Sequence, residues 1–263
     1  MARVRLDEEL VRQGLFDDVD SAYRAVLAGE VSTSSRRLTS PGEQVAPGIE
    51  LHVRGRKAYV SRGGEKLSHA LDAFAVSPEG LSCLDIGCST GGFTDCLLTR
   101  GAAHVLAVDV GYAQFDWKLR QDGRVELLER TNIVDVATPE RAGSIDLAVC
   151  DVSFTSIANI LPAVVELLGE GGRFLTLVKP QFEAAREEVG PGGIVRDEGV
   201  WASVLERVAG QLAEAGLAPK ALCASPIAGA KGNREFLMLA QAGAQPAQLD
   251  IQAAIAETRE MSQ

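Results

Sequence analysis

The sequence lacks the features of a membrane, secreted or metal-binding protein. No run approaches the ~20 apolar residues that a membrane-spanning helix needs, and the charged start from Met1 to Glu9 is unlike a signal peptide. The five cysteines form no CxxC pair, which indicates reduced thiols, and the three histidines show no metal-ligand spacing; these residues are Cys83, Cys88, Cys96, Cys150 and Cys223, and His52, His69 and His104. We therefore expect a cytoplasmic protein without a membrane span or a metal site.

Positive charge is also scarce, and it is unevenly distributed. The chain has a net charge of −10 and a pI near 4.9, which argues against a protein that binds polyanions over its whole surface. Residues 1–66 nevertheless hold 11 basic and 10 acidic residues, whereas residues 67–263 hold 15 and 26. Within the first part, residues 33–66 hold 7 basic and 3 acidic residues. A local basic strip is compatible with RNA binding, so we expect an anionic partner to meet the N-terminal end.

At 263 residues, the chain is long enough for one large α/β domain and one small domain. We predict a small RNA-binding domain over residues 1–53, a basic linker over 54–62, a catalytic domain over 63–245 and a C-terminal tail with a short helix over 246–263.

The N-terminal region shows two short helical patterns, at residues 5–14 and 18–29, each ended by a glycine. The alternating residues 49–53 predict a strand. The region resembles the S4 RNA-binding domain through Arg5-Leu6-Asp7, Leu10, Gly14, Ser21, Ala22, Ala25, Gly29, Val31 and Gly42. The resemblance implies a small α+β fold.

The stretch from Leu81 to Leu98 predicts a cofactor-binding loop. A buried strand over 81–86 meets a glycine turn, and a helical pattern follows. The acid Asp109 ends the next strand, about 20 residues after Gly87, where a carboxylate accepts hydrogen bonds from a ribose diol. The spacing Gly87-x-x-x-Gly91 departs from the dinucleotide pattern, and Asp85 would repel a pyrophosphate but suit a cationic ligand. S-adenosylmethionine therefore fits better than NAD.

From residue 81 onward, strands and helices alternate, which is typical of a doubly wound parallel sheet. We expect seven strands, at about 81–86, 103–108, 125–130, 145–150, 173–178, 218–225 and 235–240. We expect helices at about 65–74, 93–98, 114–120, 157–168 and 200–215. The glycine-rich loop at 191–197 is either a lid beside the site or a surface connector.

Three charged residues lie where strands of this sheet begin or end, which is where open α/β sheets bind their ligands. They are Asp151, Lys179 and Glu235. One interpretation is a structural ion pair. The other is a general base that draws the proton from a ribose 2′-hydroxyl, with carboxylates orienting a buried lysine and a second lysine, Lys66, assisting it.

Six ordered motifs of the chain resemble the TlyA family of S4-containing ribosomal RNA 2′-O-methyltransferases, historically called haemolysins. They are residues 61–67 (SRGGEKL), 85–95 (DIGCSTGGFTD), 107–111 (AVDVG), 129–132 (ERTN), 177–183 (LVKPQFE) and 232–236 (GNREF). The family has an FtsJ-like, Rossmann-like class I methyltransferase domain with a Lys-Asp-Lys-Glu tetrad. The resemblance implies S-adenosyl-L-methionine as cofactor, cytidine 2′-hydroxyls of ribosomal RNA or ribosomal subunits as substrate, and Lys66, Asp151, Lys179 and Glu235 as the tetrad.

Two further sets of residues complete the predicted sites. The cofactor set comprises Asp85, Gly87, Ser89, Thr90, Gly91 and Gly92, with Asp109 and Val110 at the ribose, Asn132 on the adenine side, and Asp151. The RNA set comprises Arg3, Arg5, Arg36, Arg37, Arg56, Lys57 and Arg62, whose charges would meet phosphates.

Three alternatives remain open on the sequence alone. A membrane-active protein, which the older family name suggests, is disfavoured because no segment is long enough to span a bilayer. An RNA-binding protein without methyl transfer is disfavoured by the complete tetrad. A base methyltransferase remains the enzymatic alternative, because Asp151-Val152-Ser153-Phe154 after Cys150 partly resembles the motif of base-directed enzymes.

Overall fold

The computed structural model describes residues 3–16, 18–55, 58–229 and 231–260. The chain divides into two compact units, residues 1–57 and 58–263. The second unit thus begins inside the segment predicted as a linker, because Tyr59 and Val60 pack with its core and the Val60 N–H donates to Asp95 Oδ2 at 2.8 Å. Arg56 and Lys57 lie outside the described residues.

The first unit is a small α+β fold around two helices, α1 (Leu6–Arg12) and α2 (Val19–Leu27). Short strands surround them: β1 (Val4–Arg5) pairs with β4 (Gln44–Val45), and β2 (Val31–Ser32) pairs with β3 (Arg37–Leu38) and β5 (His52–Val53). The Asp18 carboxylate caps α2 by accepting from the Ser21 N–H at 2.7 Å. Leu6, Leu10 and Val26 are fully buried in the core of this unit. The two predicted helices are therefore present, and the predicted strand is limited to its last two residues.

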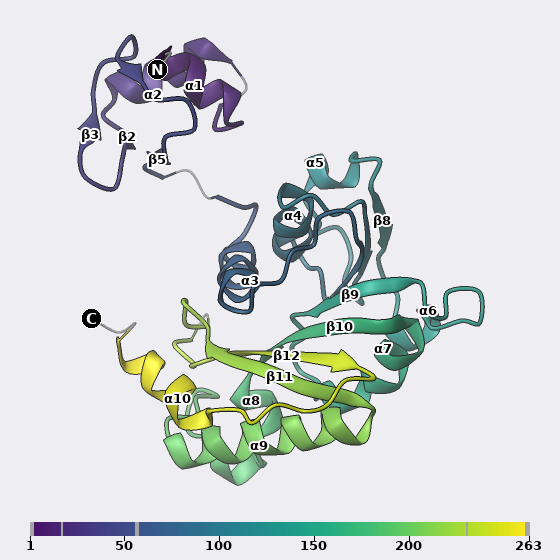
Figure 1. The fold of residues 1–263 in the computed structure, drawn as a ribbon. Coiled ribbons are helices and arrows are strands. Elements are labelled where there is room, and N and C mark those ends of the chain that lie inside the picture. The colour runs from purple at the N-terminus through teal and green to yellow at the C-terminus, as the bar shows by residue number, and fades with distance from the viewer. Residues whose placement is uncertain (1–2, 17, 56–57, 230, 261–263) are drawn as a thin grey trace. The chain divides into compact units, whose positions relative to one another are not determined.

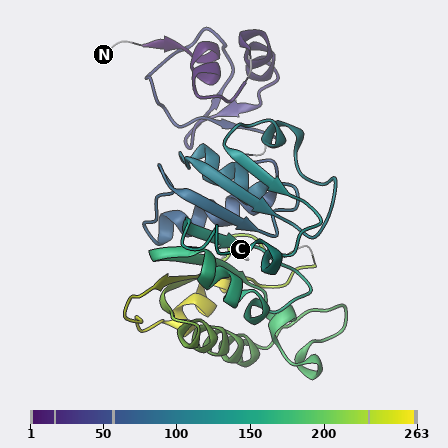
Figure 2. The ribbon, with the colours of Figure 1, turned by 90° about the vertical axis from the view of Figure 1, so that its right-hand side faces the viewer.

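The second unit contains a seven-stranded sheet in the order β11-β12-β10-β9-β6-β7-β8 (Figures 1 and 2). Its strands are β6 (Ser82–Ile86), β7 (His104–Val108), β8 (Val125–Leu128), β9 (Ile145–Cys150), β10 (Leu168–Val178), β11 (Leu217–Ala224) and β12 (Phe236–Ala242). The first five of these pair in parallel, but β12 runs antiparallel to both β10 and β11. The expectation of an all-parallel sheet was wrong at this strand, because β11 and β12 follow one another without the helical crossover that a parallel pair requires.

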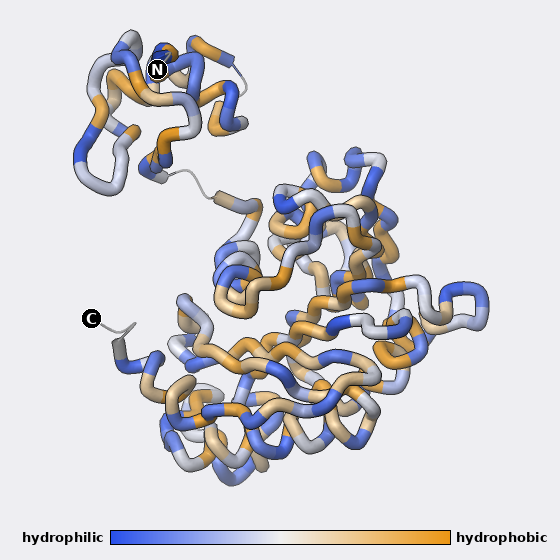
Figure 3. Tube along the Cα trace, in the orientation of Figure 1, coloured by the Kyte–Doolittle hydropathy of each residue, from blue (hydrophilic) through white to orange (hydrophobic). Residues whose placement is uncertain are grey.

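Helices cover both faces of this sheet. One face packs against α3 (Arg62–Ala73), α4 (Gly92–Thr99) and α5 (Trp117–Arg120). The other packs against α6 (Ile133–Val136), α7 (Leu161–Leu167), α9 (Glu198–Glu214) and α10 (Ile251–Glu260). In Figure 3 the strands are mainly hydrophobic, whereas α9 alternates between hydrophobic and hydrophilic residues, as expected for a helix with one buried face.

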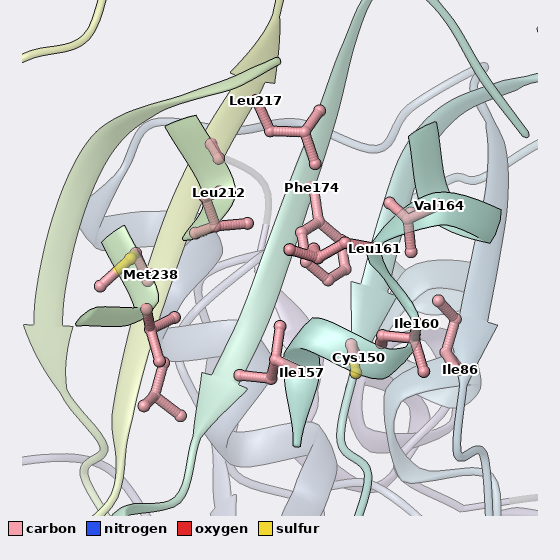
Figure 4. Packing of buried hydrophobic residues seen from close by; sticks show 14 of the residues in the cluster. Ile86, Cys150, Ile157, Ile160, Leu161, Val164, Phe174, Leu212, Leu217 and Met238 are labelled. Carbon is pink, nitrogen blue, oxygen red and sulfur yellow. The ribbon is translucent and has the colours of Figure 1, made fainter. Parts of the chain in front are cut away.

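Close packing fills the space between the sheet and the second helical face. Phe174 of β10 is fully buried and lies among Leu161, Leu212 and Ile157 (Figure 4). The single helix predicted over 157–168 is in fact a 3₁₀ turn (Ile157–Asn159) followed by α7, because Pro162 lies in the first turn of α7 and cannot continue a preceding helix. Three short helical elements of this unit escaped prediction: α6, α8 (Pro180–Glu183) and a 3₁₀ turn (Arg186–Glu188).

Candidate active site

The predicted site residues come together at one edge of the sheet. The glycine loop follows β6, Asp151 follows β9 and Lys179 follows β10, so all three lie at the carboxyl ends of parallel strands. Glu235 precedes β12, and because β12 runs in the opposite direction its start lies at the same edge.

These residues line a cavity of about 640 Å³, a size within the usual range for small-molecule sites. Its wall includes the four charged residues of the predicted tetrad, the glycine loop, three phenylalanines and two further cations. The residues that line the cavity include Arg62, Lys66, Gly87, Ser89, Thr90, Gly92, Asp151, Ser153, Phe154, Lys179, Gln181, Phe182, Lys231 and Glu235.

The tetrad forms two ion pairs. Lys66 of α3 donates to Glu235 at 2.5 Å, and both side chains are buried, with 8% and 4% of their residue surface exposed. Lys179 Nζ lies 2.6 Å from Asp151 Oδ1. Lysine is seldom buried unless it is paired or functional, so two buried lysines in one cavity, each paired with a carboxylate, indicate a functional site.

The two contacts of Lys179 differ in kind. Lys179 Nζ donates an aligned hydrogen bond to Ser153 Oγ at 2.8 Å. The shorter contact with Asp151 Oδ1 is an ion pair without the alignment of a hydrogen bond, and this oxygen accepts no hydrogen bond within the described part of the chain. Electrostatic attraction therefore holds the Lys179 amine beside Asp151, whereas the hydrogen bond to Ser153 sets the orientation of that amine.

Two aromatic rings stand beside Lys179. Phe154 is 91% exposed and adopts φ +64°, a conformation that residues other than glycine seldom adopt. Its ring lies 5.1 Å from that of Phe182, and the Phe182 ring centroid is 5.9 Å from Lys179 Nζ. A large, exposed aromatic ring on a strained backbone beside a cavity is typical of a residue that contacts a ligand, because core packing does not stabilise its side chain.

The glycine loop and Asp109 form the second half of the site. Asp109 accepts from the Ser89 N–H at 2.7 Å and from the Gly111 N–H at 2.6 Å, which fixes the loop after β6 to the loop after β7. Gly87 has φ +79°, and a side chain there would come within 2.9 Å of the Asp151 carbonyl oxygen. The wall between these loops and Asp151 is consequently built of main-chain atoms, to which a bulky ligand can approach closely.

Five residues of the predicted cofactor set do not line this cavity, and one of them is Asp109, whose carboxylate accepts the N–H groups of Ser89 and Gly111. Asp85 is fully buried behind the loop, where its Oδ2 accepts from the N–H and Oγ1 of Thr94 at 2.9 and 2.7 Å. Gly91 faces Phe115 and Leu119 instead. Val110 is 73% exposed, and exposed Asn132 caps α6 by accepting from the Val134 N–H at 3.2 Å. Among the cofactor residues, Gly87, Ser89, Thr90, Gly92 and Asp151 do line it.

Burial raises the pKa of several groups in and near the loop, including Asp85, Cys88 and Cys150. Desolvation, together with the Asp151 charge, raises the pKa of Asp85 to about 7, against the hydrogen bonds from Thr94. The same burial raises the pKa of the Cys150 thiol to about 12. All five cysteines are buried, so none is placed as a thiolate nucleophile, which removes the cysteine-based route to base methylation.

The predicted RNA-binding arginines of the first unit differ in the contacts that their guanidinium groups make. Arg5 pairs with buried Asp7 at 2.6 Å, and Arg36 pairs with Glu43. Arg3 donates to the Gln44 carbonyl oxygen at 3.4 Å, and Arg37 is exposed.

In the second unit, Arg62 is exposed and lines the cavity. Lys231, Gln181 and Ser153 also line it and were not predicted. The available signal was their position in the sequence: Lys231 directly precedes the GNREF motif, Gln181 directly follows Lys179-Pro180, and Ser153 lies two positions after Asp151.

In the described ranges, no helix is both long and apolar enough to cross a membrane. No group of three or more histidine, cysteine, aspartate or glutamate side chains, among those with described positions, is arranged to hold a metal ion.

Comparison with known proteins agrees with this geometry. Residues 59–242 match the family model of the FtsJ-like methyltransferases. The seven-stranded mixed sheet, with a glycine loop after its first strand and an acid after its second, is the fold of a class I methyltransferase.

Relatives across most of the chain narrow the class to a family. The chain is 50% identical over 237 residues to YqxC of Bacillus subtilis, provisionally assigned as an rRNA methyltransferase, which covers 89% of this chain and 84% of that protein. It is 44% identical over 238 residues to the 16S/23S rRNA (cytidine-2′-O)-methyltransferase TlyA of Mycobacterium tuberculosis, covering 90% and 89%. A solved structure from Streptococcus thermophilus, provisionally assigned as a hemolysin, is 43% identical with a TM-score of 0.73 and covers 100% of this chain and 98% of that one. The chain belongs to the TlyA family, also known as hemolysin A, with an FtsJ-like methyltransferase domain.

Proposed function

We propose that this protein transfers a methyl group from S-adenosyl-L-methionine to the 2′-hydroxyl of cytidine in ribosomal RNA. The observation that supports the proposal most strongly is the pair of buried lysines, each with a carboxylate, in a cavity beside the glycine loop. The names of relatives that are 44–50% identical point to the same substrate.

The residues of the site fit the cofactor. The main-chain wall of Gly87, Ser89 and Gly92 suits the methionine portion. Asp109, whose carboxylate accepts the Ser89 N–H, is the proposed partner of the ribose diol. Bound there, S-adenosyl-L-methionine supplies an electrophilic methyl group on a sulfonium. Val110 and Asn132 remain candidates for the adenine side, outside the main cavity, and Asp85 acts by supporting the loop through Thr94.

Lys179 is the proposed general base. It accepts the proton of the 2′-hydroxyl, and Asp151 balances the charge of the resulting ammonium at 2.6 Å. The Lys66–Glu235 pair holds a second cation at the cavity wall, where it stabilises the negative charge that develops on the ribose oxygen. Aligning the hydroxyl with the methyl group supplies much of the remaining acceleration.

Phe154 and Phe182 are placed to hold the target base. Stacking of a base on an aromatic ring contributes about 1–3 kcal/mol in single-stranded recognition, and the exposed ring of Phe154 is available for it. Arg62, Arg3, Arg5, Arg36 and Arg37, together with Arg56 and Lys57, are proposed to contact phosphates. Such a substrate implies a cytoplasmic protein.

Methyl transfer from labelled S-adenosyl-L-methionine to ribosomal subunits and to free ribosomal RNA tests the proposal. A 2′-O-methyl group protects the neighbouring phosphodiester bond from alkali, whereas a base methyl does not, so alkaline hydrolysis separates the two reactions. We expect an alkali-resistant labelled dinucleotide from the wild-type protein, and at least ~10²-fold less from Lys179→Met. Lys220→Met, at a half-buried residue of β11 that does not line the cavity, is the matched control. Label in alkali-sensitive products would replace the proposal with base methylation.

A further inference from the structure

Ser153 connects the loop after β9 to the amine of Lys179. Its Oγ accepts the 2.8 Å hydrogen bond from Lys179 Nζ, which is the aligned hydrogen bond of this amine among the described residues. Asp151 lies closer, but its contact is an unaligned ion pair. We propose that Ser153 is a positioning residue that aims the Lys179 amine at the 2′-hydroxyl. The inference rests on the proposed function, in which Lys179 is the base.

The argument follows from the shape of an amine. A neutral lysine amine has two N–H bonds and one lone pair, so that fixing both N–H bonds also fixes the direction of the lone pair. Asp151 and Ser153 occupy two directions around Nζ. With the carboxylate alone, the amine could rotate about its Cε–Nζ bond, because an ion pair imposes little direction. The Ser153 hydrogen bond fixes one N–H bond, the Asp151 charge attracts the other, and the lone pair is left with the remaining direction around Nζ.

The loop that holds Ser153 is itself anchored. Glu183 of α8 accepts from Ser156 Oγ at 2.7 Å and from the Ile157 N–H at 2.8 Å. Phe154, with φ +64°, turns the backbone directly after Ser153 and places its ring against Phe182. These contacts hold the loop in place, so Ser153 needs no rearrangement when the substrate binds. A positioning group is effective when it is held in this way before the reaction begins.

The test compares Ser153→Ala with Ser153→Thr, which keeps the hydroxyl, and with Ser203→Ala, which removes an exposed hydroxyl from α9. Single-turnover methyl transfer to ribosomal RNA is measured across pH. For Ser153→Ala we expect a plateau rate about tenfold lower, because the base is misdirected, and KM values for cofactor and RNA within about twofold of wild type. Ser153→Thr and Ser203→Ala should behave as wild type.

The pH profile separates positioning from a general loss of structure. The hydrogen bond that Lys179 donates to Ser153 favours the ammonium form, so its removal should move the acidic limb of the profile to lower pH. The charged groups lining the cavity around Lys179 are Asp151, Glu235, Lys66, Arg62 and Lys231, and Ser153→Ala alters none of them. An unmoved limb, a limb moved to higher pH, or an equal loss in Ser153→Thr would overturn the proposal.

A second readout does not depend on activity. In the full-length protein with ¹³C-labelled lysine, the Lys179 signal, assigned with Lys179→Arg, is titrated in wild type and in Ser153→Ala. A lower titration midpoint in Ser153→Ala supports the contact even if no RNA becomes methylated, and in that case only the proposed function fails. Equal midpoints would overturn the role of Ser153.

Discussion

Lys66 Nζ and Glu235 Oε2 lie 2.5 Å apart in the folded protein, although 169 positions separate the two residues in the chain. Neither side chain could be buried alone, because an uncompensated charge in the interior is strongly destabilising. The pair therefore ties α3 to the start of β12.

The first prediction is strong coupling between these two side chains. Glu235→Gln should destabilise the second unit by about 3 kcal/mol, since it leaves Lys66 buried without a countercharge. Lys66→Met in the same chain should recover part of that loss. A double-mutant cycle measured by denaturant unfolding gives the coupling energy. The exposed pair Arg259–Glu198 is the control, and its coupling should be far weaker because solvent screens the two charges. Similar coupling in the two pairs would contradict the prediction.

The second prediction concerns Phe154. Because its side chain is 91% exposed, Phe154→Ala should change stability by less than about 1 kcal/mol. It should nevertheless lower kcat/KM for RNA by roughly 10-fold or more through the lost stacking of the base, while cofactor binding is unchanged. Val165→Ala, at another exposed apolar residue, should have no effect on either measurement. Wild-type kinetics in Phe154→Ala would rule out a stacking role.

The third prediction follows from the raised pKa of Asp85, which is about 7 in the folded protein. An unfolded aspartate loses its proton near pH 4, whereas folded Asp85 keeps its proton until about pH 7. The folded state thus binds more protons than the unfolded state in this interval, so its stability falls as pH rises from about 4 to 7 and is constant above that. Asp85→Asn should lack this component.

Tryptophan fluorescence can follow this effect, because both tryptophans, Trp117 and Trp201, lie in the second unit. The difference in unfolding free energy between wild type and Asp85→Asn should change in favour of the variant between pH 5 and pH 8. A difference that does not vary with pH would show that Asp85 is ionised throughout.

The fourth prediction concerns the first unit. Buried Glu9 accepts hydrogen bonds from Arg12, Gln13 and the Gly48 N–H, and the contact with Arg12 above all lowers its pKa to about 2. A lowered pKa stabilises the fold above about pH 4.5, and this contribution is lost as pH falls toward 2. Glu9→Gln should therefore cost about 1–3 kcal/mol at neutral pH. Hydrogen exchange of the α1 amides measures this cost, and exposed Glu8→Gln should leave it unchanged.

The sequence was most informative where one local pattern determines one element. The run before Gly87 and the charged residues at strand ends predicted β6, β9, β10 and the edge of the sheet at which Asp151 and Lys179 lie. Periodicity and glycine placement are properties of neighbouring residues, so they can be recognised without the fold.

The sequence was least informative where a role depends on residues distant in the chain. Asp85 was expected to face a cationic ligand, but its carboxylate turns back to Thr94 because the helix after the loop brings that N–H and hydroxyl within reach. The contact of Ser153 with Lys179 spans 26 positions and follows from the pairing of β9 with β10. The antiparallel direction of β12 has the same origin, since strand order is a tertiary property.

The position of β12 also has a consequence for how the protein is made. The strand lies between β10 and β11, yet it is the last strand of the sheet to leave the ribosome during synthesis. Until residues 235–242 have emerged, β10 keeps an unpaired edge and Lys66 has no carboxylate beside it. The sheet of the nascent domain therefore remains open until β12 has emerged, so the cavity wall that Glu235 contributes is completed only after every other strand of the sheet has been made.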